Sequence, residues 1–78
     1  MENTSLFSRE EMECANAKFI LKEVSEILKE RGYNPINQIV GYLLSGDPGY
    51  VTSYKDAREK ITSLDRADLL AYLLKGYL

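Results

Sequence analysis

Apolar residues recur at three- and four-residue steps over the first third of the chain. The stripe consists of Met12, Ala15, Phe19, Ile20, Val24, Ile27 and Leu28. This spacing places them on one face of a helix, because an α-helix completes a turn in 3.6 residues. Ser8 and Glu11 match the capping box that marks a helix start, and Gly32 accepts the left-handed conformation that ends one. We therefore predict an amphipathic helix of about twenty residues between Ser8 and Gly32.

A second helix is predicted from Pro35 to about Ser45. Asn34 can cap it, and proline is favoured at the first helical position. Its apolar surface is broad and comprises Ile36, Ile39, Val40, Leu43 and Leu44. The stretch Gly32–Gly46 contains no charged residue, although 28% of the chain is charged. A helix that is apolar on most sides presents more apolar surface than one small core needs, so part of it is expected to face a second copy.

Two further helices are predicted in the C-terminal half. Residues 47–52 are expected to form a helical turn or loop, because Asp47-Pro48 repeats the cap-and-proline signal. A short helix then covers about residues 53–62, with an inward face of Tyr54, Ala57 and Ile61. Asp65 caps a last helix, whose apolar face consists of Leu69, Leu70, Leu73 and Leu74.

No segment alternates apolar and polar residues over enough positions to predict a strand. The predicted fold is therefore all-α, a compact bundle of four to five short helices. Residues 1–7 show no periodicity and are expected to form a flexible, disordered N-terminal arm before a single helical domain at residues 8–78. A domain of this size buries only about 60% of its unfolded surface, and self-association is a common way to stabilise it.

The composition argues against catalysis and against a metal or cofactor. The chain has no histidine, which is the commonest general base, and only one cysteine, so neither a disulfide nor a metal site can be completed. Cys14 lies beside Glu11 and Glu13, and these acids disfavour a reactive thiolate. The glycines of GYLLSGDPGY lack the Gly-Lys-Ser/Thr of a phosphate loop. We expect no catalytic residue, no metal and no cofactor.

Charge and hydropathy favour a soluble, cytoplasmic protein. The net charge is −2 and the pI is about 5.0. The N-terminus does not resemble a secretory signal, and the longest apolar run is far too short to span a membrane.

One alternative to a protein-binding role is a small helix-turn-helix-like protein associated with nucleic acid. Its recognition helix would carry Lys55, Arg58 and Lys60, with Asp56 and Glu59 among them. Mixed charge of this kind is more typical of a solvated surface, so nucleic acid is not the expected partner.

Small and polar residues form a separate stripe on the second helix. Asn37, Gly41 and Ser45 recur every four residues, and a glycine inside a helix costs up to about 1 kcal/mol relative to alanine. Gly41 is therefore expected to permit close approach by another backbone. Nearby tyrosines combine large apolar area with a polar tip, which suits an interface, although they would also suit the edge of a core. The predicted homodimer interface comprises Tyr33, Asn37, Val40, Gly41, Tyr42, Leu44 and Tyr50.

The segment GYNPINQIVGYLLSGDP resembles the signature of the IreB family, small cytoplasmic proteins of low-GC Gram-positive bacteria. The resemblance continues through Tyr50, Ala57-Arg58, Asp68-Leu69-Leu70 and Tyr77-Leu78. It implies a helical homodimer without enzymatic activity, acting as a negative regulator of intrinsic cephalosporin resistance. It also implies a transmembrane Ser/Thr kinase with PASTA repeats and its phosphatase as partners, beside an unidentified downstream protein target.

The same resemblance implies phosphorylation of the N-terminal arm. Family acceptor threonines lie there, one of them three residues before a phenylalanine, and Asn3-Thr4-Ser5-Leu6-Phe7 matches that pattern. Thr4 is thus the implied acceptor. The position of the family's other acceptor is Met1 here, and Leu6 replaces the usual basic residue. Ser5 and Ser8 are further hydroxyls that the resemblance does not support as acceptors.

Overall fold

The computed structural model describes the backbone of residues 9–78 and the side-chain surroundings of residues 16–78. Four α-helices and two short 3-10 turns make up this part of the chain, and it contains no strand. In chain order they are α1 (Arg9–Glu30), α2 (Pro35–Ser45), η1 (Pro48–Tyr50), η2 (Tyr54–Asp56), α3 (Ala57–Thr62) and α4 (Arg66–Lys75). The prediction of an all-α fold is confirmed. The predicted arm at residues 1–7 lies outside the described residues.

The helix ends follow the local capping chemistry. The Asn34 side chain accepts a hydrogen bond from the Asn37 N–H at 3.1 Å, which satisfies one free amide at the start of α2. Gly46 ends α2 in the left-handed conformation, with φ of 75°, and its N–H donates to the Tyr42 carbonyl at 2.7 Å. The Asp65 carboxylate caps α4 by accepting from the Ala67 N–H at 2.7 Å. These three predicted boundaries are confirmed.

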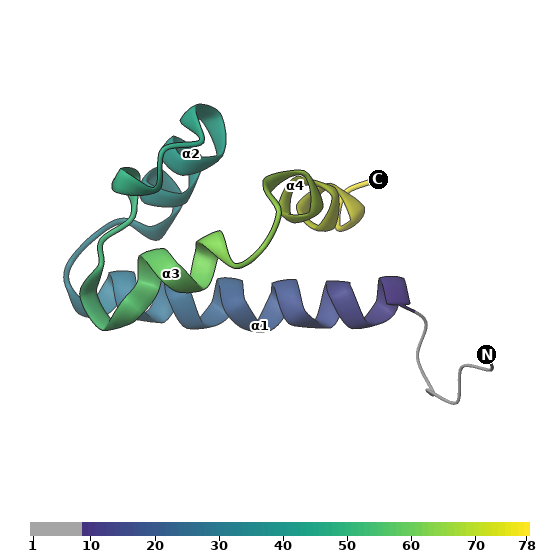
Figure 1. Cartoon of the computed structure of the whole chain (residues 1–78), viewed down its shortest axis with the longest axis horizontal. Coiled ribbons are helices and arrows are strands. Elements are labelled where there is room, and N and C mark those ends of the chain that lie inside the picture. The colour runs from purple at the N-terminus through teal and green to yellow at the C-terminus, as the bar shows by residue number, and fades with distance from the viewer. Residues whose placement is uncertain (1–8) are drawn as a thin grey trace.

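Helix α1 is the base on which the other elements pack (Figure 1). The short helix α3 lies along the C-terminal half of α1, α2 lies above that half, and α4 lies beyond the end of α3, toward the N-terminal half of α1. Both α2 and α4 also contact α1. Because α2 and α4 pack on the rest of the molecule from one side only, each keeps part of its surface outside.

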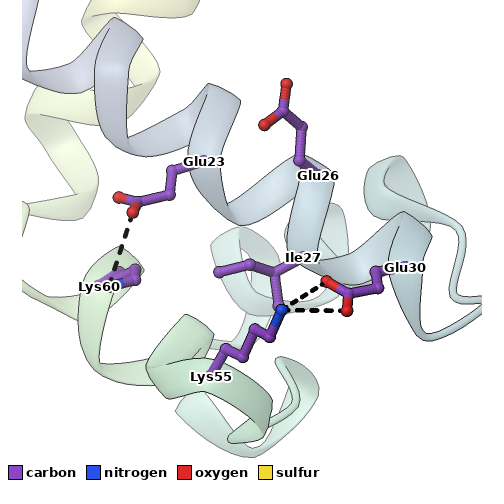
Figure 2. A pocket seen from close by; sticks show the side chains of 6 residues that line it. All are labelled: Glu23, Glu26, Ile27, Glu30, Lys55 and Lys60. Atoms are coloured by element: carbon purple, nitrogen blue, oxygen red, sulfur yellow. Dashed lines mark hydrogen bonds and ion pairs between the residues drawn. The ribbon is translucent and has the colours of Figure 1, made fainter.

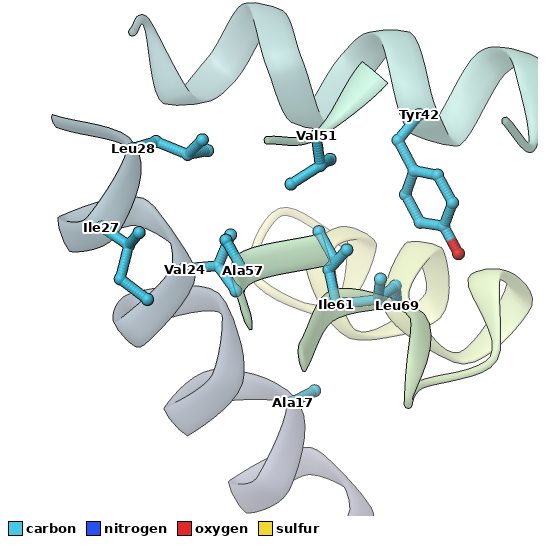
Figure 3. Packing of buried hydrophobic residues seen from close by; sticks show 9 residues of the cluster. All are labelled: Ala17, Val24, Ile27, Leu28, Tyr42, Val51, Ala57, Ile61 and Leu69. Atoms are coloured by element: carbon cyan, nitrogen blue, oxygen red, sulfur yellow. The ribbon is translucent and has the colours of Figure 1, made fainter. Parts of the chain in front are cut away.

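A small apolar core lies where α1 meets the other elements. Its buried residues are Ala17, Val24, Ile27, Leu28, Tyr42, Val51, Ala57, Ile61 and Leu69. Figure 3 shows Val51, Ala57 and Ile61 converging on the α1 side chains from the opposite wall. No polar or charged side chain is buried in the described part of the chain. The predicted inward positions Ala57 and Ile61 are confirmed. The core is stabilised by the burial and close packing of apolar side chains.

Tyr42 differs from the interface prediction. Its side chain is only 5% exposed, and it points from α2 toward Ile61 and Leu69 inside the same subunit (Figure 3). The turn of α2 places Tyr42 on the face opposite Val40 and Leu44. Tyr42 is therefore a core residue and is not available at the surface.

The third predicted helix is shorter than expected. Lys55 and Asp56 have positive φ values of 50° and 63°, so regular α-helix begins only at Ala57. A left-handed residue reverses the local path of the backbone and interrupts the helical hydrogen-bond ladder. The Arg58 N–H donates instead to the Thr52 carbonyl at 3.0 Å.

Candidate functional site

An exposed apolar stripe runs along α2. Ile36 is 71% exposed, Leu44 is 82% exposed, and Val40 lies between them. The three residues recur every four positions, so they form one outward face, which we call the α2 stripe. Contiguous exposed apolar surface on a small soluble protein is typical of a contact site for another protein.

A groove lies beside the α2 stripe, between α1, α2 and α4. It has a volume of about 330 Å³ and is lined by Leu21, Ser25, Pro35, Ile36, Ile39, Val40, Leu43 and Leu73. All of these residues except Ser25 are apolar. Arg66 of α4 donates to the Leu43 carbonyl at 2.9 Å, which fixes the C-terminal end of α2 relative to α4. The groove is therefore a preformed apolar feature of the subunit.

Helix α4 extends the apolar surface. Only Leu69 of its four predicted apolar-face leucines is buried, whereas Leu70, Leu73 and Leu74 are exposed. The difference from a fully inward face arises because α4 lies at the edge of the molecule and contacts α1 along a short length (Figure 1).

The other predicted interface residues occupy a different side of α2. Tyr33 and Tyr50 are both partly exposed, and they line a polar pocket together with Arg58. Asn37 is exposed near the start of the helix. The structure thus divides the predicted set, with Val40 and Leu44 on the α2 stripe, the two tyrosines around the polar pocket, and Tyr42 in the core.

The reason for a glycine at position 41 also differs from the prediction. A Cβ atom at Gly41 would lie 2.5 Å from Cδ1 of Tyr50, so the close neighbour is an aromatic ring of the same chain and not another backbone. Ser45 completes this stripe by donating to the Gly41 carbonyl at 2.8 Å and accepting from the Asp47 N–H at 2.9 Å. Gly41 and Ser45 therefore allow the η1 turn to pack closely against α2.

A charged cleft lies between α1 and the η2–α3 segment. It has a volume of about 320 Å³, and its lining includes three glutamates of α1 and two lysines (Figure 2). Lys55 pairs with Glu30 at 3.0 Å, and Lys60 lies 3.8 Å from Glu23. Glu26 points away from both lysines (Figure 2). The lysines are thus used to hold α3 and η2 against α1.

These ion pairs bear on the nucleic-acid alternative. Of its three basic residues, Lys55 and Lys60 pair with α1 carboxylates, and Arg58 donates through Nε to the Val51 carbonyl at 2.8 Å. Helix α3 has only six residues and packs on α1 through Ala57 and Ile61. With both lysines paired, the segment lacks the continuous basic face with which a recognition helix enters a groove.

The Glu30–Lys55 pair predicts a pH dependence of stability. Hydrogen bonds from Lys55 and Tyr54 hold the pKa of Glu30 below its ordinary value of 4.5. A carboxyl with a lowered pKa stabilises the folded state above that ordinary value, and the contribution is lost as the pH falls through the folded-state pKa. Glu30→Gln should therefore lower the melting temperature slightly near neutral pH, and the difference should disappear in acid well below pH 4.5.

The expected effect is small, because both side chains are about half exposed. Glu26→Gln removes the same charge from an α1 residue that points away from both lysines, and it should leave the melting temperature unchanged at either pH (Figure 2). A Glu30→Gln difference that persists undiminished in acid would contradict the assignment to this ion pair. In alkali the linkage has the opposite sign, because Glu30 raises the pKa of Lys55 above 10.5. That stabilisation is fully present below 10.5 and is lost as the pH rises through the higher folded-state pKa.

Residues 16–78 offer little for metal or membrane chemistry. The described part contains no group of three His, Cys, Asp or Glu side chains placed to hold a metal ion. Its helices also include none that is long and apolar enough to cross a bilayer. Thr4, the implied phosphoacceptor, together with Ser5 and Ser8, lies outside the described residues.

The described residues thus form a small all-α subunit with an exposed apolar surface on α2 and α4. Residues 2–78 match the family described as IreB regulatory phosphoprotein. The chain belongs to this family, and the resemblance predicted from the α2 segment is confirmed. The family's description indicates a regulatory role.

Two relatives match over nearly their whole length. A UPF0297 protein of Ruminiclostridium cellulolyticum is 50% identical over 78 residues, which are 100% of this chain and 89% of that protein. A UPF0297 protein of Acetivibrio thermocellus is 49% identical over 75 residues, which are 96% of this chain and 83% of that protein.

Proposed function

We propose that the chain is a non-catalytic, cytoplasmic phosphoprotein. A transmembrane Ser/Thr kinase with PASTA repeats phosphorylates it, and a partner phosphatase removes the phosphate. The chain acts as a negative regulator in a pathway that controls the response to cell-envelope stress and intrinsic cephalosporin resistance. The observation that carries this proposal is the match of residues 2–78, the arm included, to a family of regulatory phosphoproteins. The pattern Asn3-Thr4-Ser5-Leu6-Phe7 supports Thr4 as the acceptor.

A phosphate on Thr4 would change the charge of the arm strongly. It adds about −1.5 to −2 charges at neutral pH and three strong acceptor oxygens. The whole chain carries a net charge of −2, so one modification roughly doubles that charge. A change of this size is able to switch a contact between the arm and a binding partner.

Homodimerisation is the second part of the proposal, and the α2 stripe with the neighbouring groove supports it. In the isolated subunit, Ile36 and Leu44 are mostly exposed, although leucine and isoleucine are among the residues most often buried. A two-fold pairing would let each α2 stripe contact the same surface of the second copy. Val40 and Leu44 are the residues of the predicted interface that this arrangement uses.

Thr4→Ala tests the phosphorylation directly. Incubation of the wild-type chain with a PASTA-type kinase and ATP should add one phosphate, seen in the intact mass, because Thr4 is the implied acceptor. Thr4→Ala should abolish the added mass, whereas Ser5→Ala, which removes the adjacent hydroxyl, should leave it unchanged. Wild-type chain that gains no mass, or Thr4→Ala chain that still gains it, would overturn the assignment of this acceptor.

A further inference from the structure

A polar pocket on the opposite side of α2 from the stripe lies at the C-terminal end of α1. Its volume is about 230 Å³, and its lining consists of Tyr33, Gln38, Gly49, Tyr50, Thr52, Ser53 and Arg58. We call it the Arg58 pocket. Arg58 is the one charged side chain in this lining, and no carboxylate accompanies it. The pocket therefore presents a net positive charge, although the chain as a whole is acidic.

Most of the hydrogen-bond donors of Arg58 are not used within the described part of the subunit. Nε donates to the Val51 carbonyl at 2.8 Å, and Val51 is a fully buried core residue, so the guanidinium is anchored. A guanidinium has five N–H donors, and the four on the terminal nitrogens have no acceptor among the described residues. An anchored guanidinium with free terminal donors matches the planar, two-pronged recognition of a phosphate or carboxylate.

Hydroxyl groups surround this charge. Thr52 Oγ1 accepts from the Tyr54 N–H at 3.2 Å, which leaves its own O–H free to donate. The Ser53 hydroxyl makes no capping bond to η2. Tyr33, Tyr50 and Gln38 add further donors to the lining. A ring of neutral donors around one arginine suits a ligand with several acceptor oxygens, and a phosphoryl group has three.

The length of α1 excludes the chain's own arm as the source of such a group. Helix α1 has 22 residues and is therefore about 33 Å long, and the Arg58 pocket lies near its C-terminal end. Thr4 is five residues from Arg9, and five extended residues span at most about 18 Å. A phosphate on Thr4 thus cannot reach the pocket of its own subunit, and an arm that fills the pocket must come from another copy.

We infer that the Arg58 pocket binds the phosphorylated Thr4 segment of a second copy of this chain. The inference rests on the proposed phosphorylation of Thr4 and adds to it the place where the modified residue docks. If two copies pair so that each arm spans the distance to the other's pocket, the pairing raises the effective concentration of the arm and strengthens an otherwise weak contact.

The test uses the full chain and a synthetic peptide of residues 1–8 phosphorylated on Thr4, followed by amide chemical shifts in solution. The peptide should shift the amides of Gly49, Tyr50, Thr52, Ser53 and Arg58, and the unphosphorylated peptide should not. Arg58→Gln should weaken binding at least about tenfold, because it removes charge-assisted hydrogen bonds. Lys22→Gln removes one positive charge from an exposed position of α1 outside the pocket and should leave the affinity unchanged.

Arg58→Gln also removes the hydrogen bond to the Val51 carbonyl, so this variant could lose binding through a loss of folding. A second variant separates the two effects. Ser53→Ala removes a hydroxyl that makes no capping bond, so the fold should persist while binding weakens about threefold or more. Pocket amides that do not move at millimolar phosphopeptide would overturn the inference. So would inorganic phosphate binding as tightly as the phosphopeptide, because the arm would then contribute nothing. The synthetic peptide needs no kinase, so either result leaves the proposed phosphorylation to be judged separately.

Discussion

Leu28→Ala is expected to leave the chain largely unfolded at room temperature. Leu28 is fully buried at the centre of the core, and truncation of such a leucine costs about 2–5 kcal/mol, including the cavity left behind. A core in a domain of about this size rarely supplies more than about 3–5 kcal/mol of net stability. The measurement is the helical circular dichroism signal followed during thermal unfolding.

Leu78→Ala is the matched control for this experiment. It removes the same atoms from a residue that is 98% exposed, so the change in stability should stay within about 0.5 kcal/mol. Equal melting temperatures for Leu28→Ala and Leu78→Ala would show that Leu28 does not hold the core together in solution.

Leu44→Lys is expected to convert the proposed homodimer into a monomer. Leu44 is 82% exposed in the subunit, so lysine fits there without disturbing the core, but in a dimer it would bury an unpaired charge against the α2 stripe. The dissociation constant should rise at least about a hundredfold, because burying an unpaired charge costs several kcal/mol. Sedimentation velocity over a concentration series measures the shift, and circular dichroism checks that the helices remain.

Asn16→Lys adds the same charge to an exposed position of α1 away from the stripe and should leave the sedimentation unchanged. A wild-type chain that sediments as a monomer at every concentration would refute the dimer. A Leu44→Lys chain that still dimerises would place the interface elsewhere. Gly41→Leu is a poor test of assembly, because the new side chain would first displace Tyr50 within the subunit.

The helix boundaries were predictable because their causes are local. The side chains of Asn34 and Asp65 each accept a hydrogen bond from a backbone N–H within three residues. Gly46 ends α2 by adopting the left-handed conformation.

Helical periodicity also identified Val24, Ile27 and Leu28 of α1 as core residues. The same stripe was wrong at Phe19, which is 65% exposed, and it missed Ala17, which is buried.

The orientation of α2 was not predictable from the same pattern. With no charged residue to mark an outer face, periodicity cannot decide whether Tyr42 or Leu44 faces the core, and packing against α3 and α4 decides it in favour of Tyr42. The left-handed pair Lys55 and Asp56 was also missed, because neither residue is a glycine. In the structure Lys55 pairs with Glu30, which is 25 residues away, and no local pattern indicates such a contact.

The Arg58 pocket escaped prediction for a related reason. Its residues come from the α1–α2 loop, α2, η1, the segment after η1, and α3, so no short motif contains them. The sequence pattern contains no usable signal for it, because Arg58 stands among other charged residues, and only the structure shows that both neighbouring lysines pair with α1 while Arg58 does not.

The absence of buried polar side chains from the core of residues 16–78 affects how this sequence can vary. No hydrogen-bonded anchor has to be kept, so Val24, Val51 and Ile61 should tolerate exchange among aliphatic residues of similar volume with losses below about 1.5 kcal/mol. Position 41 has no such freedom, because any side chain larger than hydrogen must move the Tyr50 ring. We therefore expect the interior aliphatic residues to vary widely among relatives of this fold, whereas the glycine beneath the exposed Tyr50 ring should vary little.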